Sequence, residues 1–272
     1  MSTRYSPLSA SQLEPAEKLL EFAIRSWNPP GERKTAERPA RVFVTVCRQP
    51  GAGAISFSHK LTERLNQHEE EEGGQKDWSA WDRELVQKVS EETGVAKQII
   101  EMMPNRRNTW LDDLLRGVFA NENPPDAAEI RAYKQMLVSV HALAKEGHTI
   151  IVGQGGTFIT QGMTAAIHLR LVAPIEHRTK YTAERENISL HDAGVRIAEL
   201  DRKRRDFYHR YWPGRAIAPE TFTMTLNSAE LSMNELVESV LPLIRLREAA
   251  AAQNGPREAG LELTRASATL HA

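Results

Sequence analysis

Five short, mostly apolar runs, each followed by a segment with helical periodicity, limit this chain to one class of fold. Short β-branched runs bounded by turns are typical of strands buried on both faces of a sheet. Helices of crossover length between such strands favour a parallel sheet covered on both faces. The sequence therefore predicts an α/β fold with three α/β/α layers around a mainly parallel, five-stranded sheet. Its strands are expected at residues 41–47, in a brief extended piece that starts at residue 77 and ends at 80, and at 148–153, 165–173 and 221–227.

The segments between the strands predict the helical layers. Helices are expected at residues 55–67, 126–146, 174–187, 190–211 and 233–250, and the charged run HEEEEGGQKD is interpreted as a solvated loop after the first of them. Ligands of parallel sheets bind at the carboxyl ends of the strands. The loops after residues 47, 80, 153, 173 and 227 are therefore expected to form the rim of a site.

Length and composition favour one domain with appendages, because 272 residues with 40% hydrophobic content bury one substantial core. We expect an N-terminal helix and linker at 1–40, the domain at 41–246, and a disordered tail at 247–272. The single cysteine, Cys47, excludes an intrachain disulfide and a cysteine-rich zinc site. Nine histidines form no HExxH pattern, so no metal site is expected. Without a signal peptide or a long apolar segment, the expected location is cytoplasmic, with no membrane contact.

The balance of charge argues against a dedicated nucleic-acid binder. Thirty-five basic and thirty-six acidic residues give a formal net charge of −1, whereas nucleic-acid-binding domains carry a basic excess. A local basic cluster at 196–215 keeps nucleic-acid binding open as a minor alternative, which a steep dependence on salt would favour.

The first loop has the layout of a phosphate-binding turn. In QPGAGAIS, Gly51 and Gly53 stand between a strand and the start of a helix, where successive N–H groups and the helix dipole favour an anion. A tight turn that merely requires glycines is the alternative. The pattern GxxxxGK[ST] is not satisfied, because Arg48 occupies the first glycine position and Ala54 the lysine position.

Several separated motifs, in order along residues 41–245, resemble the cytidylate kinase-like family of P-loop proteins, relatives of the nucleoside monophosphate kinases. They are CRQPGAGAISFS, SAWDRELVQKVSEETG, IIVGQGG, LVAPIEHR, DRKRRDFYHRYW and TLNS. The order of these motifs is more specific than any one of them. The resemblance implies a P-loop kinase-like fold with a helical lid, ATP with Mg2+, and a nucleoside monophosphate acceptor.

The resemblance also assigns roles to residues of this sequence. It implies positive charge for catalysis from Arg48, Arg204 and Arg205. It implies ATP binding by Arg48, Gln49, Gly51, Ala52, Gly53, Ala54 and Ser56, and substrate binding by Asp82, Arg83, Gln154 and Tyr208. Two roles have ordinary alternatives: Asp82 can cap a helix, and Ser56 is one residue away from the usual Mg2+-binding hydroxyl.

Two positions depart from the family pattern, and a third departs from the general P-loop pattern. Ile55 stands where the family usually has arginine, Gln154 replaces the arginine of GRG, and Ala54 occupies the lysine position of GxxxxGK[ST]. Phosphoryl transfer depends mainly on positioning and positive charge, which Arg48, Lys60 and the 202–205 cluster can supply in part. The first hypothesis is therefore an ATP-dependent kinase acting on CMP, dCMP or a similar acceptor. The alternative is an impaired P-loop protein that acts as a nucleotide-binding or regulatory module, with a protein partner at the N-terminal helix or the C-terminal tail.

Overall fold

The computed structural model describes residues 41–74, 77–86, 127–215 and 217–254. The predicted N-terminal helix and linker at 1–40 lie outside the described residues, as do 87–126 and 255–272. The protein contacts expected of the N-terminal helix and of the end of the tail therefore stay predictions. Among the described helices, none is both long and apolar enough to cross a membrane.

All five strands lie parallel in a single sheet with the order β2-β3-β1-β4-β5. The central strand, β1, is buried along most of its length because its apolar, β-branched side chains face a helical layer on each side. The predicted five-stranded parallel sheet is confirmed. The strands are β1 (Phe43–Arg48), β2 (Ser79–Trp81), β3 (Thr149–Val152), β4 (Ala166–Val172) and β5 (Met224–Asn227).

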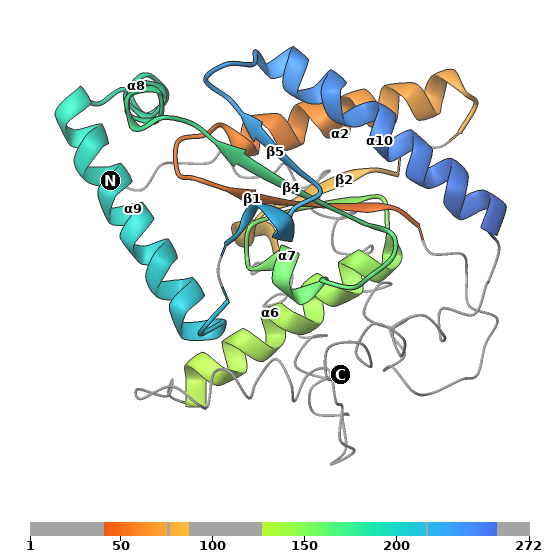
Figure 1. Cartoon of the computed structure of the whole chain (residues 1–272), viewed down its shortest axis with the longest axis horizontal. Coiled ribbons are helices and arrows are strands. Elements are labelled where there is room, and N and C mark those ends of the chain that lie inside the picture. Colours follow the sequence, from red (N-terminus) through yellow and green to blue (C-terminus); the bar gives the residue numbers. More distant parts are fainter. Residues whose placement is uncertain (1–40, 75–76, 87–126, 216, 255–272) are drawn as a thin grey trace, which may run out of the picture.

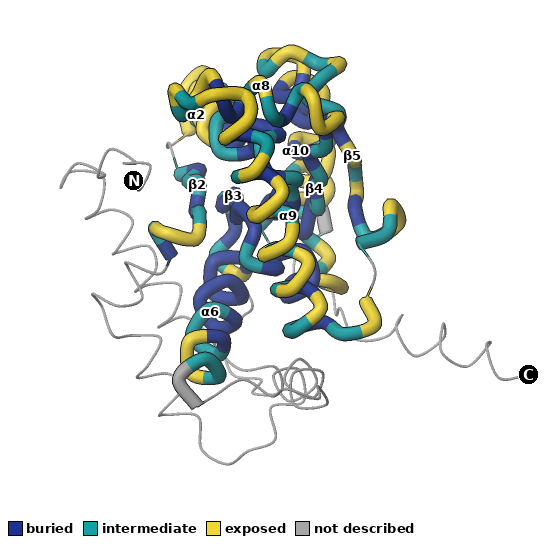
Figure 2. Tube along the Cα trace, turned by 90° about the vertical axis from the view of Figure 1, so that its left-hand side faces the viewer, coloured by how far each residue is buried: buried dark blue, intermediate teal, exposed yellow. Residues whose placement is uncertain are grey.

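Helices cover both faces of the sheet, which gives the predicted three layers (Figure 1). One face carries α2 (Ala54–Glu71) and α10 (Met233–Asn254), and the other carries α6 (Ala127–Glu146) and α7 (Gly156–Ile159). Two further helices, α8 (Ile175–Glu186) and α9 (Leu190–Tyr211), pack on each other beside the sheet, and a 3-10 turn, η1 (Pro219–Thr221), precedes β5. Figure 2 shows β3 and much of α6 in dark blue, with exposed residues along α2, α8 and α9.

Two hydrophobic clusters follow from this layering. One lies between the sheet and the pair α2 and α10, with Phe57, Leu61 and Leu236 among its members. The other lies between the sheet and α6, and it includes Tyr208 and Trp212 from the end of α9. The carboxyl-terminal end of α9 is thus part of the core, and this fixes how the helix crosses the edge of the sheet.

Two helices extend farther than the sequence predicts. The run interpreted as a solvated loop is helical as far as Glu71, so the predicted end at residue 67 was wrong. Glutamate is a good helix former, and the end of a helix needs no burial to persist. Helix α10 likewise continues to Asn254, so residues 247–254 of the expected tail are helical. The alanines of REAAAAQN favour this extension.

A buried histidine on α6 makes the stability of the fold dependent on pH. Burial, and then repulsion from Lys145, lowers the pKa of His141 from 6.5 to about 4. Because the folded pKa lies below the unfolded value, the contribution of neutral His141 is complete above pH 6.5 and is lost as the pH falls toward 4. We expect this residue to account for about 2 kcal/mol of lost stability at pH 5.

Urea unfolding at pH 7 and pH 5 tests this expectation. The variant His141→Gln carries no ionisable group there, so its free energy of unfolding is expected to fall less than that of the parent chain between the two pH values. Equal losses in the two proteins would contradict the assignment.

Candidate functional site

The turn between β1 and α2 presents unpaired backbone donors at the carboxyl end of the sheet. Gly53 is left-handed, with φ 75° and ψ 14°, and the helix begins at the next residue. Within the described part of the chain, the N–H groups of Gly53, Ala54 and Ile55 have no hydrogen-bond acceptor. A left-handed residue followed by a helical one forms an anion-binding nest, and the dipole of α2 adds to its positive potential. The predicted phosphate-binding turn therefore has the required backbone conformation.

The same turn is held tightly against α8 by Arg178. A Cβ atom on Gly51 would come within 2.8 Å of the carbonyl oxygen of Arg178, so only glycine fits there. The buried guanidinium of Arg178 donates to the carbonyl of Pro50 at 3.2 Å and to the carboxylate of Asp201 at 2.9 Å. This arginine therefore ties the turn to α9 as well, a role that spacing in the sequence did not reveal although it lies in the motif LVAPIEHR.

The side chain of Gln49, a predicted ATP-binding residue, connects two loops of the site. Its side-chain oxygen accepts a hydrogen bond from the N–H of Ala173 at 2.9 Å. This bond links the loop after β1 to the loop after β4. Ala52 is buried beside it and donates its N–H to the carbonyl of Gln49 at 3.2 Å.

The loop after β3 supplies a second set of donors next to the first. Gly153, Gln154 and Gly155 all have positive φ angles, of 78°, 55° and 69°. The side-chain nitrogen of Gln154 is buried and has no hydrogen-bond partner among the described residues. An unpaired buried donor is costly unless a ligand satisfies it, so Gln154 marks a position for an acceptor group.

Two arginines meet at this edge of the sheet. The guanidinium of Arg48 lies directly on the α-carbon of Gly153, where a Cβ atom would come within 1.6 Å of Nη1. Arg204, on α9, donates to the carbonyl of Arg48 at 2.6 Å. In the described part of the chain, neither guanidinium forms an ion pair with a carboxylate.

Electrostatics at the arginine pair favour an anion. Burial, and then repulsion from Arg204, lowers the pKa of Arg48 to about 10. The pKa of Arg204 is also lowered, mainly by burial. Both groups stay charged at neutral pH, so two desolvated cations lie close together, and among the described residues no carboxylate is close enough to either for an ion pair. A phosphate group would relieve that repulsion and bind both guanidiniums through charge-assisted hydrogen bonds.

Two of the predicted residues lie apart from this pair, whereas Tyr208 and Asp82 are near enough to Arg48 to affect its pKa. Arg205 is exposed on the outward side of α9, and Arg83 is exposed after β2. Tyr208 is buried with its hydroxyl 3.6 Å from the sulfur of Cys47, and burial raises the pKa of Tyr208. Asp82 accepts a hydrogen bond from the N–H of Leu85 at 2.9 Å, so the capping alternative is confirmed.

The first turn of α2 does not fit direct binding of Mg2+. The side chain of Ile55 has no oxygen, and the hydroxyl of Ser56 is already engaged: it lies 3.1 Å from the hydroxyl of Tyr181 and accepts from Arg185 at 2.9 Å. Ala54, at the lysine position, is buried in the core. The exposed Arg185 therefore supplies positive charge beside this turn, a contribution that the sequence did not reveal because the residue lies far along the chain.

The arrangement as a whole is suited to an oligophosphate. Backbone donors, an unpaired amide and three guanidiniums line one edge of the sheet, and the chemistry of phosphoryl transfer requires little else from a protein.

Comparisons with known proteins agree with this geometry. Residues 43–230 match the model of the Cytidylate kinase-like family. Among solved structures, the fold is similar to that of an uncharacterized protein from Eubacterium ventriosum, with a TM-score of 0.50 and 16% identity over 75% of this chain and 99% of that one. At that identity the likeness concerns the fold alone. The search of curated proteins found no match.

Proposed function

Since the chain belongs to the cytidylate kinase-like family, we propose that it is a nucleoside monophosphate kinase that transfers the γ-phosphate of ATP to CMP, dCMP or a similar acceptor. The observation that carries the proposal is the pair of desolvated guanidiniums, Arg48 and Arg204, beside unpaired backbone donors. Such a pair stabilises the charge of a transferring phosphoryl group, which is the main demand of this reaction.

Each part of the site then has a role in the proposed reaction. The nest at Gly53 and Ala54 binds phosphate oxygens of ATP, while Arg48 and Arg204 stand beside the phosphoryl group as it moves. An oxygen of the acceptor phosphate attacks the γ-phosphorus, and the bond to the bridging oxygen of ADP breaks. The amide of Gln154 donates to an oxygen of the acceptor or of the transferred group.

The missing loop lysine is offset by arginine in this proposal. Arg185 lies at the first turn of α2 through its bonds to Ser56 and Tyr181, so it adds charge near the position that Ala54 leaves apolar. Because the first turn offers no free hydroxyl, Mg2+ is expected to enter only as part of the MgATP substrate.

The proposal predicts that Arg204 is needed for turnover and that Arg205 is not. Purified protein is incubated with ATP, Mg2+ and each of CMP, dCMP, UMP and AMP, and diphosphate products are quantified. The variant Arg204→Met is expected to lose about a hundredfold to a thousandfold in rate, because it removes one preorganised donor. Arg205→Met is the matched control: it removes the same charge from the exposed side of the same helix and is expected to change the rate only slightly. Equal losses in both variants would contradict the proposal.

A second candidate function is a nucleotide-binding module without catalysis. The observations that favour it are the apolar Ala54 and the engaged hydroxyl of Ser56. If no acceptor is phosphorylated but ATP still raises the melting temperature, as a ligand of the folded state does, this second function replaces the first. ATP-binding by the residues of the turn is common to both.

A further inference from the structure

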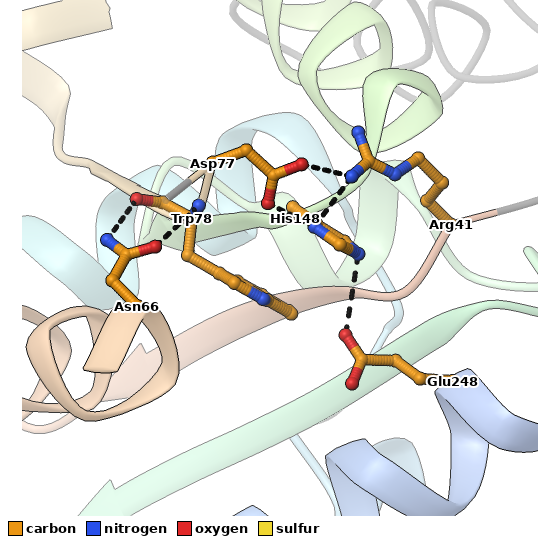
Figure 3. A network of polar contacts seen from close by, with 6 residues as sticks. All are labelled: Arg41, Asn66, Asp77, Trp78, His148 and Glu248. Carbon is orange, nitrogen blue, oxygen red and sulfur yellow. Dashed lines mark hydrogen bonds and ion pairs between the residues drawn. The ribbon is translucent and has the colours of Figure 1, made fainter. Parts of the chain in front are cut away.

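A second polar cluster lies at the amino end of the sheet, opposite the arginine pair (Figure 3). Arg41 lies two residues before β1, Asp77 and Trp78 precede β2, and His148 precedes β3. Glu248 reaches the same place from α10. None of these residues has a part in the proposed kinase reaction, so their arrangement requires its own explanation.

The ring of His148 is held in one orientation. It stacks on the indole of Trp78 with the centroids 4.8 Å apart and the planes 5° from parallel. The backbone of Trp78 is in turn fixed by Asn66, whose amide bonds to its N–H and its carbonyl, both at 3.0 Å. The imidazole therefore presents its two nitrogens in fixed directions.

A free lone pair on Nε2 requires the proton of the neutral imidazole on Nδ1, and the contact with Asp77 favours that tautomer. Oδ1 of Asp77 is in very close contact with Nδ1, and two lone pairs do not face each other at such a contact, so a hydrogen lies between them. Arg41 also lies 2.8 Å from Nδ1 but has its own acceptor in Oδ2 of Asp77. In the neutral ring, the lone pair of Nε2 therefore points away from Asp77 and toward Glu248.

Two glutamates face that lone pair. Oε1 of Glu248 lies 3.4 Å from Nε2, and it is buried without a hydrogen-bond partner in the described part of the chain. An oxygen of Glu69, on α2, completes the group, and the three ligand atoms lie within 4.8 Å of one another. Two ligands about 2.0–2.2 Å from a tetrahedral metal ion are themselves roughly 3.4 Å apart. The pair Nε2 and Oε1 thus has the separation that a shared ion requires.

Charge at the cluster agrees with a divalent ion. Glu69, Asp77 and Glu248 contribute three negative charges and Arg41 one positive charge, which leaves an excess of two with a neutral His148. Asp77 also fits the usual outer partner of a metal-bound histidine, a carboxylate that accepts the proton of the second ring nitrogen.

We propose that Glu69, His148 and Glu248 bind a divalent transition-metal ion such as Zn2+, with Asp77 orienting His148. The ion would join the ends of α2 and α10 to the start of β3 and so act as a structural clamp remote from the kinase site. The mixed imidazole and carboxylate ligands favour Zn2+ over Mg2+. The sequence led us to expect no metal site, because these ligands are far apart in the chain and follow no spacing motif.

The experiment is a titration of the full, untagged, chelator-treated chain with ZnCl2 by calorimetry, paired with melting curves. We expect one saturable Zn2+ site and a melting temperature that rises with Zn2+. The variants Glu248→Gln and Asp77→Asn keep the shape of each side chain and are expected to weaken binding by on the order of tenfold to a hundredfold. A millimolar excess of Mg2+ is expected not to displace the ion.

The matched control is Glu71→Gln, which removes one exposed carboxylate from the same end of α2 and is expected to bind Zn2+ like the parent chain. Circular dichroism of each variant verifies the fold. The proposal is overturned if Zn2+ does not bind saturably, or if binding is unchanged in both Glu248→Gln and Asp77→Asn. Either result would leave His148 as an imidazole held only by ion pairs. Because kinase turnover is not measured, failure here leaves the proposed function untouched.

Discussion

The variant Arg48→Met is expected to lose about a thousandfold in kcat/KM for phosphoryl transfer while keeping its fold. Arg48 lies on Gly153 with its carbonyl bound by Arg204, so its guanidinium is placed before any substrate arrives. Methionine keeps the apolar part of the stem but removes the charge. Because burial and the nearby Arg204 already disfavour that charge in the folded protein, its removal is expected to cost little stability.

Two further measurements separate lost charge from lost structure. ATP is expected to raise the melting temperature of the parent chain and to raise that of Arg48→Met much less. The variant Arg48→Lys restores a charge but not the planar fork that binds two phosphate oxygens, so we expect only partial recovery of the rate. A variant Arg48→Met with parental kcat/KM would exclude this residue from the reaction.

The strands and their parallel arrangement were accessible from the sequence because a buried parallel strand leaves a strong local signal. The run VFVTVC has no polar face, and the glycines that follow it fix where the chain turns. The glycine turn after β1 was predicted for the same reason, because the left-handed conformation at Gly53 depends only on a few neighbouring residues.

Contacts between distant segments were not accessible in this way. Arg178, Arg185 and Trp212 reach the two loops from helices far along the chain, and no spacing rule relates them to Gly51 or Gly155. Arg204 and Arg205 show the same limit of sequence patterns, although they are neighbours in the chain. Both belong to one basic run, yet only the first faces the sheet, because the aromatic residues at the end of α9 fix the rotation of that helix.

Helix ends were predicted least well, and this had consequences. Helix α2 extends to Glu71 and α10 to Asn254, and the first of these extensions brings Glu69 to Glu248 and His148. Both extensions lie in exposed, charged or alanine-rich sequence, where no apolar periodicity marks the end of the element. The proposed metal site therefore depends on the part of the fold for which sequence patterns are weakest.

The variant Gly155→Ala is expected to destabilise the protein by about 3 kcal/mol, for two separable reasons. Gly155 has φ 69° at the start of α7, a conformation that costs a residue with a side chain about 1–2 kcal/mol. A Cβ atom there would also lie 1.9 Å from the indole ring of Trp212. That ring is buried and stacks on Phe158 at 5.4 Å, so it cannot move without disturbing the core, and overpacking adds about 1–3 kcal/mol.

Thermal unfolding measures the total loss of stability in Gly155→Ala. The same substitution at a second glycine separates the backbone cost from the packing cost. A loss of 3 kcal/mol corresponds to a fall of roughly 6–12 °C in the melting temperature for a chain of this size. Gly162 also has a positive φ, of 88°, but nothing lies within 4 Å of its added Cβ, so Gly162→Ala is expected to show the backbone cost alone. The double variant Gly155→Ala/Trp212→Phe is expected to recover part of the loss, because the smaller ring leaves room for the methyl group. If Gly155→Ala and Gly162→Ala melted at the same temperature, the close contact with Trp212 would not hold the end of α9 in place, and the position of Arg204 beside Arg48 would need another cause.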